Sequence, residues 1–281
     1  MKTIDENFLR PRLEPRTNDS HKGDYGHLLL VCGSQPMPGA AVLATGAALK
    51  SGCGLVTLHS TQAATLAAVM AFPSAMLSTD PDRCFSLVPE GMLRFAAIAV
   101  GPGLGVAPQT VAALQKLLMT AREDNIPMVL DADAINILAT HPEFCKLIPE
   151  GSIMTPHEAE LQRLIGSDPE LSKDEAVFKL CRETGCTVVA KGFHTRIITP
   201  DGQKYVNTTG NPGLAKGGSG DVLTGLVGGL LARGYDALTA AALGVWIHGY
   251  AGDSLTETCT AEAYNSRDLI DSLYLGFKSL M

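Results

Sequence analysis

The chain has 281 residues, enough for one large α/β domain or two small ones, and its 46% content of hydrophobic residues excludes a disordered or fibrous protein. Its net charge of -7, with basic residues scattered along the sequence, argues against a surface for nucleic acid or for an anionic membrane. The longest strongly apolar stretch, residues 222–232, is about half as long as a bilayer span requires. No apolar signal segment opens the chain, so the sequence does not predict secretion. The seven cysteines form no CxxC pair, which is typical of proteins in the reducing cytoplasm.

Short apolar runs that alternate with helix-like stretches predict parallel strands buried on both faces. These runs cover residues 27–32, 54–59, 96–100, 127–132, 152–154 and 187–191. Crossover helices are predicted where apolar residues recur at three- and four-residue steps, in residues 39–51, 107–121, 157–164 and 174–184. The alternation predicts an α/β fold with a central, mostly parallel sheet.

The pattern changes after residue 191. The segments TRIITP and QKYVN alternate around Asp201 and Gly202, a dipeptide that predicts the two-residue turn of an antiparallel hairpin. From residue 220 to the end the sequence predicts helices, with breaks near residues 233–236 and near Thr258. No low-complexity tract, charged linker or fixed repeat marks a domain boundary.

The 29 glycines gather in short clusters, and almost every cluster follows a predicted strand, where sheets of this class bind ligands. The sharpest cluster lies in residues 210–232, where three glycines surround Ser219 just before Asp221. The backbone N–H groups of residues 217–220, together with the N-terminus of the helix that follows, predict a nest for an anion such as phosphate. Asp221 either caps this helix or takes a proton from an attacking hydroxyl, and the neighbouring glycines favour the second role.

Two further segments follow predicted strands. Residues 101–105, GPGLG, match neither the GxGxxG nor the Walker A motif, and they form either a tight turn or a close approach to a ligand. Residues 154–164 place His157 and Glu160 on one face of a helix. In one interpretation, His157 is a surface residue and Glu160 is a charge in the first turn of the helix. In the other, the pair supplies a ligand contact and holds a metal-bound water.

Charged residues also stand at the ends of two other predicted strands. Asp131 and Asp133 close a buried strand, where carboxylates either cap a helix or bind substrate or Mg²⁺. Lys191 ends another strand, where an ammonium meets either a phosphate or a surface carboxylate. In residues 34–58, Gly39 opens a helix of small residues that would let a bulky ligand lie close.

These segments, in this order, resemble the ADP- or ATP-dependent NAD(P)H-hydrate dehydratases of the ribokinase-like superfamily. The resemblance covers residues 23–253 through HKGDYGHLLLVCGS, MPGAA, GPGLG, LDADA, TPHEAE, KG followed by Thr195, and GGSGDVLTG. It implies a ribokinase-like three-layer αβα sandwich with a late antiparallel hairpin, and one dehydratase domain over residues 1–281. In this family the nucleotide phosphorylates the hydrate of NADH or NADPH, and loss of phosphate regenerates the reduced cofactor.

The resemblance also implies roles for individual residues. Asp221 is expected to be the catalytic carboxylate and to contact the hydrate, and Glu160 is expected to hold Mg²⁺ through water. The hydrate is further expected to contact Ala41, Gly103 and His157. The residues expected to contact the nucleotide are Lys191, Gly192, Phe193, His194, Thr195, Gly217, Gly218, Ser219 and Gly220.

Mg²⁺ and either ADP or ATP are the implied cofactor and phosphoryl donor, and the resemblance also implies a cytoplasmic homotetramer that works with a separate NAD(P)H-hydrate epimerase. One alternative is a ribokinase-like kinase of a small vitamin-precursor alcohol, hydroxymethylpyrimidine or hydroxyethylthiazole. Such kinases share the glycine-rich loop and its aspartate, but they generally carry Asn at the position of His157 and lack MPGAA. Another alternative is a nucleotide sensor without turnover, which has no use for a base at Asp221.

Overall fold

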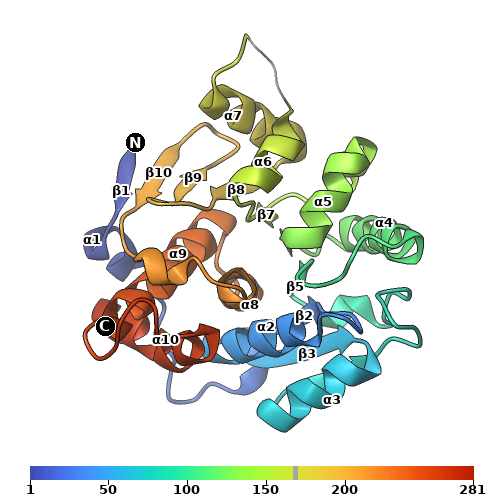
Figure 1. Cartoon of the computed structure of the whole chain (residues 1–281), viewed down its shortest axis with the longest axis horizontal. Helices are drawn as coiled ribbons and strands as arrows, with labels where there is room; N and C mark the ends of the chain where they lie inside the picture. Colours follow the sequence, from blue (N-terminus) through green and yellow to red (C-terminus); the bar gives the residue numbers. More distant parts are fainter. Residues whose placement is uncertain (167–169) are drawn as a thin grey trace.

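The computed structural model describes residues 1–166 and 170–281, and within them one ten-stranded sheet crosses the molecule (Figure 1). The strand order is β1-β10-β9-β8-β7-β6-β5-β2-β3-β4. The strands are β1 (Lys2–Ile4), β2 (His27–Val31), β3 (Leu55–Ser60), β4 (Met76–Thr79), β5 (Ala97–Val100), β6 (Met128–Leu130), β7 (Ile153–Met154), β8 (Thr187–Ala190), β9 (Arg196–Ile198) and β10 (Lys204–Asn207). Neighbouring strands pair in parallel except at β9, which is antiparallel to β8 and β10. The predicted mostly parallel sheet with a late hairpin is confirmed.

Helices cover both faces of the sheet, which makes the predicted three-layer sandwich (Figure 1). One face packs against α2 (Pro38–Lys50), α3 (Gln62–Ala71), α8 (Ser219–Ala232), α9 (Ala237–Leu255) and α10 (Ser266–Leu280), near the short α1 (Glu6–Leu9). The other face packs against α4 (Pro108–Glu123), α5 (Ala132–Thr140), α6 (Glu158–Ile165) and α7 (Lys173–Thr184). Along β2, Leu28 and Leu30 enter the first core while Leu29 and Val31 enter the second. Burial on both faces therefore explains why this strand is continuously apolar.

Glycines in α8 let this helix approach α2 closely. A Cβ atom on Gly225 would lie 2.1 Å from the carbonyl oxygen of Ala44, and one on Gly229 would lie 2.0 Å from the hydroxyl of Ser51. The apolar, glycine-rich stretch 222–232 is buried along its whole length, so it serves helix packing. No described helix is both long and apolar enough to cross a membrane.

The hairpin turns through three residues, so the predicted two-residue turn is wrong. The amide of Thr199 donates to the carbonyl of Gln203 at 3.1 Å, which leaves residues 200–202 in the loop. Gly202 has a φ of +84°, and three-residue hairpin loops commonly place a residue of this conformation at their end. The Asp201–Gly202 signal located the hairpin but did not give its loop length.

Several elements fall outside the predicted ones. The strand predicted over residues 127–132 ends at Leu130, because Asp131 is the N-cap residue of α5. The sequence also gave no signal for β1 and β4, the two edge strands, and β4 is largely exposed, so it carries no apolar run.

Candidate active site

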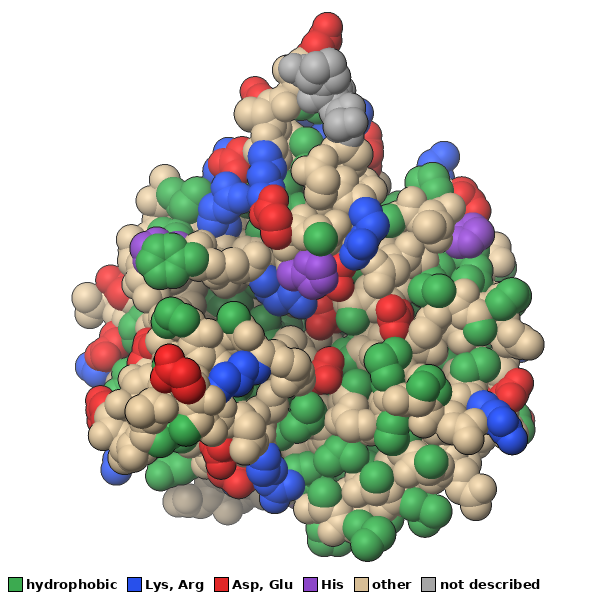
Figure 2. Space-filling view, viewed as in Figure 1, with side chains coloured by type: hydrophobic (Ala, Val, Ile, Leu, Met, Phe, Trp, Pro, Cys, Tyr) green, Lys and Arg blue, Asp and Glu red, His purple; other side chains and the backbone are tan. Residues whose placement is uncertain are grey.

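The loops that follow the strands meet at the carboxyl edge of the sheet. The amide of Gly33 donates to the carbonyl of Pro102 at 2.7 Å, which joins the loops after β2 and β5. The amide of Lys191 donates to the carbonyl of Pro156 at 2.9 Å, which joins the loops after β8 and β7. Figure 2 shows His, Lys or Arg, and acidic side chains gathered around a hollow near the middle of the face it views. The segments that the sequence singled out therefore lie together in space.

The N-terminal turn of α8 forms the nest. Gly218 is the N-cap with a φ of +90°, and a Cβ atom there would come within 2.4 Å of the Leu43 side chain. A Cβ atom on Gly220 would meet nothing closer than the Lys191 ammonium at 3.5 Å, and one on Gly217 would meet nothing within 4 Å. Gly218 is therefore required by the fold, whereas Gly217 and Gly220 leave space in front of the helix for a ligand.

Asp221 lies in the first turn of α8, three residues after the N-cap, so it does not cap the helix. Burial and the charge of Asp131 raise the pKa of its carboxyl to about 6, although the Lys191 ammonium opposes this shift. Within the described residues, no group donates a hydrogen bond to this carboxylate. A carboxyl group that titrates near neutral pH is suited to accept a proton from a bound hydroxyl.

Lys191 forms an ion pair with Asp131, with 2.7 Å between Nζ and Oδ1. The other carboxylate oxygen of Asp131 accepts a hydrogen bond from the Thr224 hydroxyl at 2.5 Å. The Asp131 side chain is 2% exposed and that of Lys191 is 19% exposed. The sequence pointed to Asp131 and Lys191 separately, but it gave no sign that they pair.

The GPGLG loop packs against the start of α2. Gly103 has a φ of +64°, and a Cβ atom there would lie 2.8 Å from Cβ of Ala40. The amide of Gly105 donates to Asp133 at 2.8 Å, so this carboxylate fixes the loop. Ala41 is fully buried, and its Cβ would lie 2.8 Å from a Cβ on Gly33. This loop therefore has the tight packing that was one of its two predicted roles.

His157 and Glu160 form a capping box at the start of α6. Nδ1 of His157 accepts hydrogen bonds from the amides of Ala159 and Glu160 at 3.1 and 3.4 Å, and Glu160 Oε2 accepts one from the amide of His157 at 2.8 Å. Because Nδ1 is an acceptor, the ring proton lies on Nε2, which is 3.2 Å from Glu160 Oε1. The Glu160 side chain is only 5% exposed, whereas that of His157 is 52% exposed and can meet a ligand.

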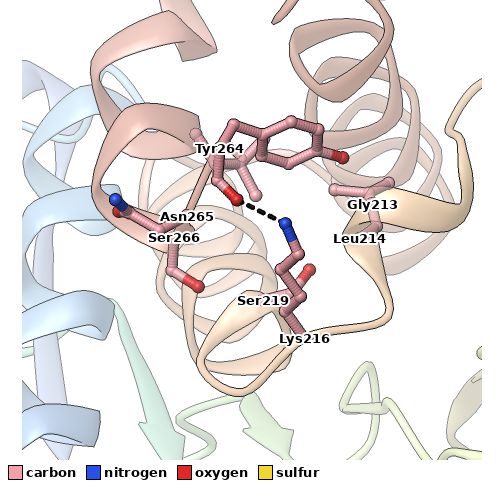
Figure 3. Close-up of a pocket in the computed structure, with 8 residues that line it drawn as sticks. Gly213, Leu214, Lys216, Ser219, Tyr264, Asn265 and Ser266 are labelled. Carbon is pink, nitrogen blue, oxygen red and sulfur yellow. Dashed lines mark hydrogen bonds between the residues drawn. The ribbon is translucent and has the colours of Figure 1, made fainter. Parts of the chain in front are cut away.

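Lys216 stands just before the nest, but its ammonium is used elsewhere. Nζ donates to three backbone carbonyls in residues 261–264, each at 2.7 Å, and Figure 3 shows the bond to Tyr264. The hydroxyl of Ser266 donates to the carbonyl of Gly217 at 3.0 Å. The segment 261–266 therefore holds the nest in place, and all three N–H groups of this lysine are occupied.

His248 contacts the first turn of α8 from the neighbouring helix, and no motif in the sequence had pointed to it. It lies in α9, and its Nε2 is 3.0 Å from the carbonyl oxygen of Ser219. Burial lowers its pKa to about 4, so the neutral ring donates its N–H to this carbonyl. A lone histidine in an otherwise apolar helix was the signal that could have drawn attention to it.

The loop after β8 carries an exposed aromatic pair. The residue Phe193 is 89% exposed, and its ring stacks on His194 with 4.0 Å between the ring centroids. The hydroxyl of Thr195 donates to the carbonyl of Gly192 at 3.2 Å, which closes the loop on itself. The two rings offer a flat surface on which a planar base could stack.

Known proteins are similar to this chain in sequence and in fold. A family model described as NAD(P)H-hydrate dehydratase matches residues 28–274. The chain is 43% identical to the ADP-dependent (S)-NAD(P)H-hydrate dehydratase of Neisseria meningitidis serogroup B, over 86% of this chain and 81% of that protein. It is 38% identical to the bifunctional NAD(P)H-hydrate repair enzyme Nnr of Moorella thermoacetica, over 97% of this chain but 53% of that protein, so it spans about half of this relative. The ADP/ATP-dependent NAD(P)H-hydrate dehydratase of Bacillus subtilis, co-crystallised with ATP and Mg²⁺, superposes with a TM-score of 0.84 at 30% identity, covering 100% of this chain and 99% of that one.

We expect Asp221→Asn to stabilise the folded protein above pH 6. The folded pKa of about 6 exceeds that of an unfolded aspartate, so ionising this carboxyl opposes folding as the pH rises through the folded pKa. Asparagine has no such cost, and the expected gain of about 1 to 3 kcal/mol at pH 8 disappears below about pH 4. Urea unfolding of the variant and the wild type at both pH values measures this difference in the free energy of unfolding.

Asp174→Asn is the control of opposite sign. Although burial raises the pKa of Asp174, the hydrogen bond from Lys204 and the charge of Arg196 lower it below its usual value. This variant is therefore expected to lose stability at pH 8. If Asp221→Asn also loses stability at pH 8, the burial of an ionised carboxylate at Asp221 is disproved.

Proposed function

The chain belongs to the NAD(P)H-hydrate dehydratase family, and on that basis we propose that it uses ADP or ATP to dehydrate the 6S hydrate of NADH and NADPH. The observation that carries the proposal is Asp221, a carboxyl group with a pKa of about 6 in the first turn of a helix that begins with an anion nest. The reaction needs a base and a phosphate site side by side, and this turn supplies both.

Asp221 is proposed to take the proton of the C6 hydroxyl while the hydroxyl oxygen attacks the terminal phosphorus of the nucleotide. The bond between that phosphorus and the bridging oxygen breaks, and AMP or ADP leaves. The phosphate ester then departs from C6 as inorganic phosphate, a proton leaves the adjacent ring carbon, and the double bond of NADH or NADPH is restored. The amides of the nest and the ammonium of Lys191 stabilise the charge of the transferred group.

Magnesium is proposed to arrive with the nucleotide. No cluster of three or more His, Cys, Asp or Glu in the described ranges could hold a metal ion by itself. Both oxygens of Glu160 already face His157. Mg²⁺ usually binds through substrate phosphates and keeps several waters, so Glu160 would contact it through water. The bound ion would supply neutralisation of phosphate charge, and the co-crystallisation of the Bacillus subtilis relative with ATP and Mg²⁺ supports its presence.

The two substrates are proposed to meet in front of the nest. The hydrate would lie toward Ala41, Gly103 and His157. The ring of His157 is exposed, whereas Ala41 and Gly103 are buried where the loop after β5 packs on α2, so they would shape the wall behind the hydrate. The nucleotide would lie on the nest, residues 217–220, with Lys191 at its phosphates and residues 192–195 beside its base. The names of the relatives favour this activity over the kinase of a small alcohol, and the carboxyl at Asp221 favours it over a sensor.

We further propose that residues 1–281 form one dehydratase domain, which works in the cytoplasm as a homotetramer beside a separate NAD(P)H-hydrate epimerase. The continuous sheet supports a single domain. Exposed Leu66 and Met70 on α3 and Leu77 on β4 supply apolar surface for a subunit contact. The bifunctional relative, half of which this chain spans, supports a companion activity.

We expect Asp221→Asn to bind ADP and ATP normally while turnover falls by about two to four orders of magnitude, the scale of a lost general base. The assay supplies NADH hydrate, Mg²⁺ and nucleotide and follows the absorbance of the regenerated NADH. In the wild type, turnover should decrease as the pH drops below about 6, because Asp221 then becomes protonated. Wild-type turnover in the variant would exclude Asp221 as the base. Nucleotide consumption with a small alcohol would favour the kinase, and binding without turnover would favour the sensor.

His157→Ala and His157→Asn together separate two functions of His157. Both variants are expected to raise KM for the hydrate and to leave KM for the nucleotide unchanged, because the exposed ring is lost in each. Only the alanine variant should also lose about 1 kcal/mol of stability, since asparagine is a good N-cap residue. Thermal unfolding and steady-state kinetics test this, and a restored KM in the asparagine variant would reduce His157 to a helix cap.

Gly220→Val is expected to abolish nucleotide binding in a folded protein. Its side chain would enter the space in front of the nest, where a Cβ atom meets no protein atom closer than 3.5 Å. Gly39→Val is the matched control, because a Cβ atom there meets nothing within 4 Å and the residue lies on the proposed hydrate side. Calorimetric titration with ADP and ATP distinguishes the two, and wild-type affinity in Gly220→Val would show that the phosphates bind elsewhere.

A further inference from the structure

Asp131 connects three elements that meet behind the nest. It is the N-cap of α5, yet its side chain makes no capping bond to that helix. Its carboxylate turns instead to Lys191 at the end of β8 and to Thr224 in α8. The next residue, Ala132, has a φ of +49°, a conformation that non-glycine residues keep when their surroundings fix it. Both carboxylate oxygens are therefore used to hold side chains of other elements.

This contact places the Lys191 ammonium against the first turn of α8. A Cβ atom on Gly220 would lie 3.5 Å from Lys191 Nζ and 3.9 Å from Asp131 Oδ2. Asp131 uses one of the three N–H groups of the ammonium, and within the described residues the other two have no protein partner. Since the Lys191 side chain is partly exposed, these two groups are available to an anion in the nest.

Two carboxylates compete for this one ammonium. Asp131 binds the Lys191 ammonium in a direct ion pair. The same ammonium lowers the pKa of Asp221 through its charge, without a hydrogen bond between the two side chains. If Asp131 released the Lys191 ammonium, this ammonium could pair with the carboxylate of Asp221 instead. An ion pair with Asp221 would keep this carboxylate ionised and occupy the oxygens that must reach the hydroxyl proton.

The other groups around Asp221 do not take over this function. Burial keeps the thiol of Cys32 protonated and the ring of His248 neutral, and Asp133 is held by the amide of Gly105. Among the described residues, the titratable and charged groups that face Asp221 are Asp131 after β6, Asp133 in α5, Lys191 after β8 and Cys32 after β2, while His248 of α9 contacts Ser219 in the same turn of α8.

Resting on the proposed function, we propose that Asp131 is a positioning residue of this reaction. It holds the Lys191 ammonium at the N-terminus of α8, directed toward the terminal phosphate, and keeps that ammonium from pairing with Asp221. Thr224 in α8 orients the carboxylate of Asp131 through its hydroxyl, and the same hydroxyl oxygen lies 3.1 Å from the carbonyl oxygen of Gly220.

The test compares Asp131→Asn with the wild type in two measurements. Calorimetric titration with ADP is expected to show binding about tenfold weaker, the scale of one hydrogen bond to a charged group. In the pH profile of kcat, the acid limb should move down by about one pH unit, because the charge that raises the pKa of Asp221 is lost and Lys191 approaches Asp221. A residue that only stabilises the fold would not move this limb.

A double variant keeps the test valid if Asp131→Asn does not fold. Lys191→Gln combined with Asp131→Asn removes both charges of the pair and leaves no unpaired buried charge. If Asp131 acts through Lys191, the double variant binds ADP within about twofold of Lys191→Gln alone. Markedly weaker binding by the double variant would overturn the proposal.

Asp174→Asn is the matched control, since Asp174 also binds two basic side chains, Arg196 and Lys204, away from the nest. It should leave ADP affinity and the acid limb unchanged. An unmoved limb together with wild-type affinity in Asp131→Asn, or equal losses in Asp174→Asn, would overturn the proposal. The ADP titration requires no turnover, so a wild-type protein that fails to dehydrate the hydrate would refute the proposed function and leave the effect of Asp131 on Lys191 measurable.

Discussion

The N-terminal turn of α8 has to accept an anion within reach of two carboxylates, and the structure around it limits this electrostatic conflict. Backbone N–H groups and the helix dipole provide the attraction. Lys191 provides a side-chain cation, and its ion pair offsets the charge of Asp131. The conflict that remains falls on Asp221, whose pKa is raised to about 6 by burial and by the charge of Asp131. The site therefore depends on the balance among three charges more than on any single residue.

Neutral contacts fix the geometry on which this balance depends. The ring of His248 is uncharged and donates to the carbonyl of Ser219, so it orients the nest without adding charge. The close approach of α8 to α2, possible because Gly225 and Gly229 have no side chain, sets the depth at which the nest lies relative to the sheet. Apolar packing thus decides where the amides point, and the charged groups decide what they bind.

The sequence predicted those features that depend on local pattern. The run at β2 is visible because both of its faces are buried, and the nest is visible because glycines cluster before Asp221. The pairing of Asp131 with Lys191 joins residues that are 60 positions apart, and no local pattern contains it. The capping box of His157 and Glu160 is local, but histidine is not among the preferred N-cap residues, so the spacing left open whether the pair carries surface and first-turn charges or binds a ligand. The fold brings these separate segments together at the carboxyl edge of the sheet, and only the structure shows that they form one site.

The contacts of Lys216 have a consequence for the synthesis of the protein. The residues of the nest are made before the segment 261–266 that holds them, and α10 follows that segment at the end of the chain. A domain generally folds as a unit, even though its N-terminal residues are synthesised first. Buried residues of α10 belong to the same core as α8, so this core is complete only when the end of the chain is present. The support of the nest and the last part of the core are therefore added at the same stage of synthesis, and a chain that ended before residue 261 would lack both.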